Sequence, residues 1–176
     1  MLDQDGMYQQ AVDAHEQALV RLARAYEWGP DERQDLLQEV HMALWHSFAS
    51  YDARCSLRTW VYRVAHNAAA SHVLRSRRFK ALPLISLEEV EAQAGVSARD
   101  EIEDVERSDL MVRLMALIQR LKPLDRQVIL LYLEGLDAAS IGEVTGISAR
   151  YVATKVCRIK GILAERFRNG GNHDHR

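Results

Sequence analysis

The spacing of the apolar residues constrains the fold of this chain most, because they recur at steps of three and four rather than two. Three long stripes of this kind occupy residues 8–26, 32–50 and 57–78. Shorter stripes follow after residue 110, where Pro123 and Gly135 end two helices. Such spacing gathers apolar side chains on one face of an amphipathic helix. Since no alternating strand pattern of useful length occurs, the sequence predicts an all-α protein of two small helical domains.

Helical periodicity weakens between the two sets of stripes. Pro83 and Gly95 interrupt residues 79–108, and acidic residues dominate there, which is typical of a linker. Residues 87–92 allow one helical turn within it. We therefore predict an N-terminal domain, a flexible acidic linker, a C-terminal domain and a disordered tail, in that order, at residues 1–79, 80–108, 109–169 and 170–176.

The charges are unevenly distributed, although the net charge is only −2. Residues 1–53 carry ten acids and three bases, whereas residues 54–80 carry seven bases and no acid. Residues 81–109 hold nine acids and two bases, and residues 148–168 hold six bases and one acid. Two separate basic segments, each in a helical pattern, indicate two contacts with a polyanion. Solvated helix faces are the alternative interpretation of such charge runs.

The composition, 48% hydrophobic and 27% charged, is typical of a folded domain. No segment approaches the roughly 20 apolar residues that cross a bilayer, and the start MLDQDGMYQQ lacks the features of a signal peptide. We expect a cytoplasmic protein without membrane insertion. Cys55 and Cys157 form no CxxC motif, so we expect reduced thiols. Neither they nor the histidines show the spacing of a metal site or a nucleophile–base pair, so we predict no enzyme, cofactor or metal.

Residues 136–160 have the anatomy of a helix-turn-helix. Asp137 is placed to cap the first helix, Gly142 leaves room for close helix crossing, Gly146 permits the turn, and Ser148 is placed to cap the second helix. The outer face of the second helix is expected to contact DNA phosphates and base edges. A helical packing unit with an inert outer face is the alternative, and the cations favour DNA. The predicted contacts are Ser148, Arg150, Tyr151, Thr154, Lys155 and Arg158.

Two strings in the first domain resemble the second conserved region of bacterial RNA polymerase sigma factors. They are DLLQEVHMALW at residues 35–45, with Phe48 and Tyr51-Asp52 after it, and SLRTWVYRVAHN at residues 56–67. With the helix-turn-helix and the short linker, the pattern is similar to the extracytoplasmic-function (ECF) group over residues 7–168. The resemblance implies a region-2-like helical bundle and a C-terminal domain that reads the minus-thirty-five element. Residues 150–155 depart from the usual recognition helix, so the promoter sequence cannot be transferred from relatives.

The resemblance implies several partners. In this family the helix matching residues 35–45 docks on a basic coiled coil of the polymerase β′ subunit, and the β flap is a further contact. The polymerase-binding residues implied are Asp35, Gln38 and Glu39, with ordinary surface polar residues as the alternative. Promoter DNA and an anti-sigma factor or other regulator are also implied, and the sequence leaves the regulator open. The linker is either a solvated tether or a segment that threads the RNA path.

The third helix is similar to the segment that recognises and opens the minus-ten element and flips a base of the non-template strand. That work needs cations for the backbone, planar groups for stacking and amides for base edges. Trp60 fits the core better than a stacking role, because it shares the face of Val64. Asn67 is the best candidate for a base contact. The implied set is Arg58, Tyr62, Arg63, His66, Asn67, Ser71 and Arg75.

We therefore predict a sigma factor that binds core RNA polymerase, directs it to specific promoters and helps to melt the minus-ten region. The alternative is a stand-alone helix-turn-helix regulator, which would dimerise and bind its operator without polymerase. The DLLQE-type helix argues against that alternative.

Overall fold

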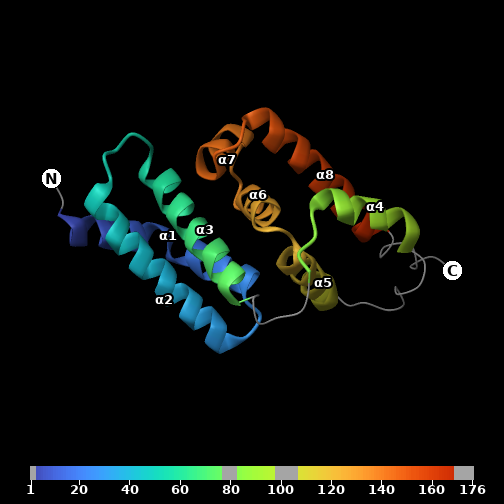
Figure 1. Ribbon diagram of the computed structural model, residues 1–176, viewed down its shortest axis with the longest axis horizontal. Helices are drawn as coiled ribbons and strands as arrows, with labels where there is room; N and C mark the ends of the chain where they lie inside the picture. Colours follow the sequence, from blue (N-terminus) through green and yellow to red (C-terminus); the bar gives the residue numbers. More distant parts are fainter. Residues whose placement is uncertain (1–2, 77–82, 98–106, 169–176) are drawn as a thin grey trace.

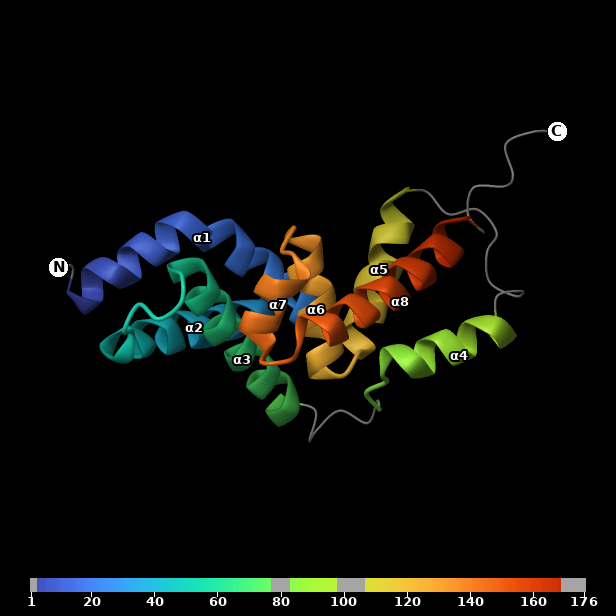
Figure 2. The same ribbon diagram turned by 90° about the horizontal axis from the view of Figure 1, so that it is seen from above.

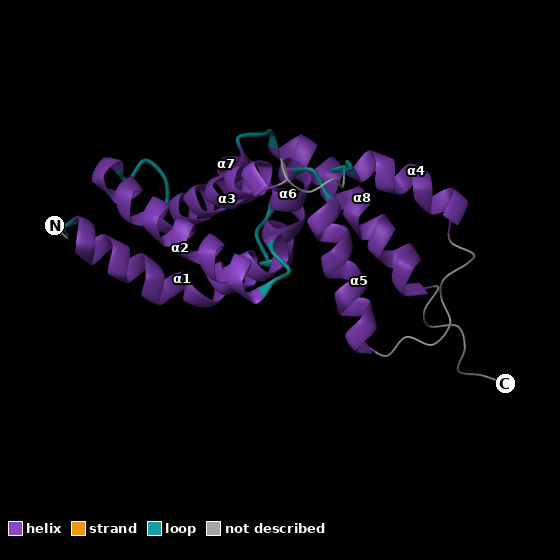
Figure 3. Cartoon of the chain, turned by 60° about the horizontal axis from the view of Figure 1, so that its bottom comes forward, coloured by secondary structure: helices purple, strands orange, loops and turns teal. Residues whose placement is uncertain are grey.

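The computed structural model describes residues 3–76, 83–97 and 107–168, and its regular elements there are all helices (Figure 3). They are α1 (Gln4–Tyr26), α2 (Pro30–Ser47), the 3-10 helix η1 (Phe48–Ser50), α3 (Leu57–Ser76), α4 (Leu87–Ser97), α5 (Arg107–Arg120), α6 (Pro123–Leu133), α7 (Ala138–Thr145) and α8 (Ala149–Arg168). The predicted all-α class with two small helical domains is confirmed. The tail predicted at residues 170–176 and parts of the predicted linker lie outside the described residues. None of the described helices is long and apolar enough to cross a membrane.

The first three helices form the N-terminal bundle, coloured blue to green in Figure 1. Asp3 caps α1 by accepting a hydrogen bond from the backbone N–H of Gly6 at 2.8 Å. Pro30 is the first residue of α2. The backbone N–H of a first helical residue has no partner within the helix, so proline, which lacks it, costs no hydrogen bond there. The apolar stripes meet in a core that fully buries Leu36, Leu44 and Val61. Burial of these stripes turns the polar faces of α2 and α3 outward.

The helices α5 to α8 form the C-terminal unit, and α4 lies alongside α8 in both Figure 1 and Figure 2. Ile118, Leu131, Ile141 and Ile159 are buried in its core. The chain before α4 pairs with the end of α5. The N–H of Ile85 donates to the carbonyl of Arg120 at 2.9 Å, and the N–H of Lys122 donates to the carbonyl of Ile85 at 2.8 Å.

The helix α4 is longer than the single turn that the sequence suggested. Ser86 and Glu89 form a capping box, in which the Ser86 hydroxyl accepts from the N–H of Glu89 at 3.3 Å and the Glu89 carboxylate accepts from the N–H of Ser86 at 2.5 Å. Leu87 and Val90 are buried, three residues apart, on the side that faces the C-terminal unit. A start signal and an apolar face together explain why this part of the predicted linker is a packed helix.

The two halves also touch each other. The guanidinium of Arg21 on α1 donates to both carboxylate oxygens of Glu134, which follows α6, at 2.6 and 2.7 Å. The amide of Gln127 on α6 donates to the carbonyl of His66 on α3 at 3.3 Å. These contacts join the N-terminal bundle to α6.

Candidate polymerase and DNA interfaces

The helix-turn-helix has the local geometry that its sequence predicts. The carboxylate of Asp137 accepts from the N–H of Ser140 at 2.8 Å, and the hydroxyl of Ser148 accepts from the N–H of Tyr151 at 3.2 Å. Gly146 has φ 77°, the left-handed conformation that ends a helix readily only with glycine. A Cβ on Gly142 would lie 2.8 Å from the carbonyl oxygen of Ile147, so the two helices cross closely only because this side chain is absent.

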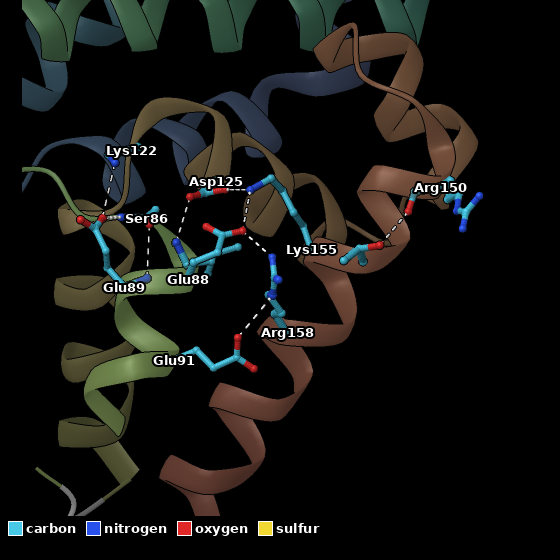
Figure 4. A network of polar contacts seen from close by, with 11 residues as sticks. Ser86, Glu88, Glu89, Glu91, Lys122, Asp125, Arg150, Lys155 and Arg158 are labelled. Carbon is cyan, nitrogen blue, oxygen red and sulfur yellow. Dashed lines mark hydrogen bonds and ion pairs between the residues drawn. The ribbon is translucent and has the colours of Figure 1, made fainter. Parts of the chain in front are cut away.

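Four of the six predicted DNA contacts are exposed, three on α8 and one directly before it. Arg150, Tyr151 and Thr154 are exposed, and Ser148 is exposed directly before the helix. In Figure 4 the guanidinium of Arg150 points away from the neighbouring helices. Cys157 is exposed one turn beyond Thr154, and a helical wheel of the sequence already places it there, although it was not among the predicted contacts.

Lys155 does not lie on the exposed face of α8, and the prediction that it points outward is wrong. Its side chain is 3% exposed, with the Nζ atom 2.5 Å from a carboxylate oxygen of Asp125 and 3.5 Å from one of Glu88 (Figure 4). The reason is its position between Val152 and Ile159, both of which face the core. Lys155 is therefore a structural cation that links α4, α6 and α8.

The surroundings of Lys155 and Glu88 favour the charged forms of both side chains. Burial alone would lower the pKa of the Lys155 ammonium, but the hydrogen bond and the charge of Asp125 outweigh burial and leave the pKa raised. The pKa of Glu88 is lowered, first by a hydrogen bond from its own backbone N–H and then by the charges of Lys155 and Arg158. Asp125 also accepts from the N–H of Leu87 at 3.0 Å, so the same carboxylate caps α4.

Arg158 lies at the border between the exposed face and α4. Its side chain is 33% exposed, and it follows exposed Thr154 by one helical turn. The guanidinium meets two carboxylates of α4, with Nη1 2.5 Å from Glu88 and Nε 3.3 Å from Glu91. Its role as a DNA contact stays a prediction, and in this structure carboxylates of α4 contact two of its three guanidinium nitrogens.

Two cations of the predicted minus-ten set contact the C-terminal half. The guanidinium of Arg63 donates to the carbonyl of Glu143 on α7 at 2.6 Å. That of Arg58 donates to the carbonyl of Glu134 at 3.5 Å, a long bond. The α3 surface predicted to meet DNA thus packs partly against α6 and α7.

Asn67, Ser71 and Arg75 follow one another on α3 at steps of four, and all three are exposed. Arg75 donates a short hydrogen bond to the carboxylate of Glu39 on α2. The side chains of Asn67 and Ser71 present an amide and a hydroxyl at the surface, as a base contact requires.

Tyr62 and His66 do not share that surface, and their burial does not fit the DNA contacts implied for them. Both are buried, His66 with 1% exposure, because their side of α3 packs against α1. The Nδ1 atom of His66 lies 3.4 Å from the Tyr26 hydroxyl, and burial lowers the pKa of His66 to about 3. Trp60 is half-buried and donates its indole N–H to the Ser47 hydroxyl at 2.9 Å, which agrees with a packing role.

The outer face of α2 presents two of the three predicted docking residues. Asp35 and Gln38 are exposed, whereas Glu39 also contacts Nδ1 of His72 at 3.1 Å besides its bond to Arg75. Two large apolar side chains continue the exposed stripe and were missed from the sequence. They are Met42, 56% exposed, and Trp45, 39% exposed. They follow Gln38 by four and seven residues, and this helical spacing could have placed them on the same face from the sequence.

Known protein families match both halves of the chain. The Sigma-70 region 2 family matches residues 11–79, which cover most of α1 and all of α2 and α3. The Sigma-70, region 4 family matches residues 111–163, which include the helix-turn-helix. The chain belongs to the sigma-70 family of RNA polymerase sigma factors. As such, it directs RNA polymerase to specific promoters, and the predicted function is confirmed.

Full-length relatives agree with this assignment. The sigma factor is 24% identical to the RNA polymerase sigma factor NccH of Alcaligenes xylosoxydans over 88% of this chain and 83% of that protein. It is 22% identical to the ECF RNA polymerase sigma factor SigW of Bacillus subtilis over 95% and 91% of the two chains. The expected ECF group is thereby confirmed. A solved structure of CnrH in complex with the cytosolic domain of CnrY shares the fold, with TM-score 0.64, 20% identity, and coverage of 94% of this chain and 90% of that chain.

Proposed function

We propose specific roles for three exposed faces of this sigma factor. The face of α2 docks on core polymerase, Asn67 and Ser71 on α3 contact the opened minus-ten strand, and the face of α8 around Arg150 reads the minus-thirty-five duplex. The observation that carries the proposal is that these faces are exposed on helices whose opposite sides are buried in the core. The sigma factor then works as a specificity subunit in the cytoplasm and carries out no reaction of its own.

The composition of the α2 face suits a protein partner rather than DNA. Asp35 and Gln38 offer oxygen acceptors for a basic surface, and Met42 and Trp45 add apolar area beside them. Exposed large apolar residues next to polar ones are typical of protein interfaces. The nearby cation Arg75 is bound to Glu39, which leaves the exposed stripe acidic and apolar. A basic coiled coil of the β′ subunit is the partner that fits, and the β flap is proposed to hold the C-terminal unit.

A regulatory protein is a second proposed partner. CnrH, which shares the fold, was solved in complex with the cytosolic domain of CnrY. In this chain a cleft between α1, α5 and α6 exposes Trp28 and Leu133 near the cation Arg24 and near the pair of Arg21 and Glu134. An apolar segment with acidic flanks, as from an anti-sigma factor, would match that lining.

A charge reversal at Asp35 tests the docking face. We expect Asp35→Arg to abolish pull-down of core polymerase, because like charges facing each other across an interface cost several kcal/mol. Asp13→Arg is the matched control, since Asp13 is an exposed acid on a different helix, α1. Both variants should melt at the wild-type temperature. Equal binding of core polymerase by the two variants would show that the α2 face is not the interface.

A further inference from the structure

The contact between α4 and Arg158 joins a DNA-facing helix to an acidic one. Arg158 lies beside the exposed face of α8 and pairs with two carboxylates of α4, Glu88 and Glu91 (Figure 4). A guanidinium offers its N–H donors in a fixed planar fork that fits carboxylates and phosphates alike. A phosphate can bind this fork fully only when a carboxylate leaves it.

The network has a buried layer and an outer layer. The pair of Lys155 and Asp125 is almost fully buried, with side chains 3% and 4% exposed, and it fixes the start of α4. The outer layer, Glu88 and Glu91 on Arg158, is between a third and a little over half exposed. Exposed ion pairs contribute little to stability. Glu88 also lies 3.5 Å from Lys155, but Asp125 is the closer partner of Lys155 at 2.5 Å, so the outer layer can be exchanged while the pair of Lys155 and Asp125 stays formed.

We propose that α4 is a built-in competitor of DNA for the recognition helix. Glu88 and Glu91 occupy Arg158 in the free chain in the place of a DNA phosphate, and binding to a duplex exchanges the two carboxylates for that phosphate. This rests on the proposed function of α8 as a DNA-reading helix. The exchange weakens binding of the free chain to DNA of any sequence, because a phosphate contact carries no base information.

The test measures binding of the full chain to a short fluorescent duplex of random sequence by anisotropy, over a series of salt concentrations. The variant is Glu88→Gln with Glu91→Gln, which keeps side-chain size and removes both charges. We expect it to bind roughly threefold to tenfold tighter than wild type, with a log-affinity versus log-salt slope steeper by about one phosphate contact. Glu89→Gln is the matched control, because Glu89 is an acid of the same helix that pairs with Lys122 instead.

A second comparison guards against a purely structural effect of the glutamines. Arg158→Ala should weaken the double variant more than it weakens wild type, because wild type must first break the pairs of Arg158 with Glu88 and Glu91, and this cost offsets part of its phosphate contact. If the double variant binds no tighter than Glu89→Gln while Arg150→Ala still weakens binding, the competition is overturned and the proposed function of α8 stands. If neither Arg150→Ala nor Arg158→Ala weakens binding, the DNA-reading role of α8 fails, and the competition fails with it.

Discussion

Replacing Lys155 by methionine tests whether the buried ion pair holds the C-terminal unit together. The change keeps the apolar stem but removes the ammonium that lies 2.5 Å from Asp125. Removing one partner of a buried pair costs about 3–5 kcal/mol, because the remaining charge is left in a poor solvent. Asp125 keeps its hydrogen bond from the N–H of Leu87, which is worth about 1 kcal/mol. We therefore expect the free energy of unfolding to fall by about 3 kcal/mol, the lower end of that range.

Urea unfolding followed by circular dichroism measures this loss. Lys160→Met is the control, because Lys160 is an exposed cation of the same helix that lies 5.5 Å from the centre of the Tyr132 ring, and we expect it to lose only about 0.5–1 kcal/mol. Adding Asp125→Asn to Lys155→Met should restore much of the loss, since it removes the stranded charge. The reasoning is refuted if Lys155→Met loses no more than Lys160→Met.

Three further predictions concern the buried histidine, the melting helix and the helix crossing. The pKa of His66 is about 3 in the folded chain and 6.5 in the unfolded chain, so on acidification protons bind the unfolded chain first. The contribution of His66 to the free energy of unfolding is therefore complete above pH 6.5, and it falls by about 1.4 kcal/mol per pH unit between pH 6.5 and about pH 3. Urea titrations should show a flatter pH dependence for His66→Gln, and parallel curves for the two proteins would contradict this. Asn67→Ala should reduce transcription from duplex promoters but not pull-down of core polymerase, and a premelted minus-ten bubble should restore part of the activity; unchanged permanganate reactivity of promoter thymines would exclude the role. Gly142→Ala should lower stability by about 1–3 kcal/mol, because the new methyl meets a backbone oxygen at 2.8 Å; a thermal melt equal to wild type would refute it.

The sequence predicted well wherever short-range chemistry decides the structure. The caps at Asp137 and Ser148 and the turn at Gly146 have the bonds and the backbone angle expected of them. Each depends on residues within a few positions along the chain. The capping box at Ser86 and Glu89 was equally readable, and it would have predicted the start of α4.

The sequence failed where a distant segment covers a helix. A helical wheel of α8 shows one apolar side, but it does not show the helix that helps to bury Lys155. That helix is α4, and the pairing of Ile85 with Leu121 places it there. The same limit applies to His66, whose surroundings come from α1 and α6. Polar residues at the edge of an apolar stripe were therefore assigned to the surface, although two elements far apart in the sequence enclose them.

The hydrogen bonds from Arg58 and Arg63 to the backbone of the C-terminal half predict that the free chain rarely populates an open form, in which the two halves separate. Exposed contacts of this kind, together with the pair of Arg21 and Glu134, contribute up to about 1 kcal/mol each, so closure is favoured by about 2 kcal/mol. That bias leaves a few per cent of molecules open and lowers the apparent affinity for promoter DNA by roughly 30-fold. We expect a polymerase surface that holds the two halves apart to supply this small free-energy difference. The sigma factor should therefore bind DNA weakly alone and more tightly once it is held on the polymerase.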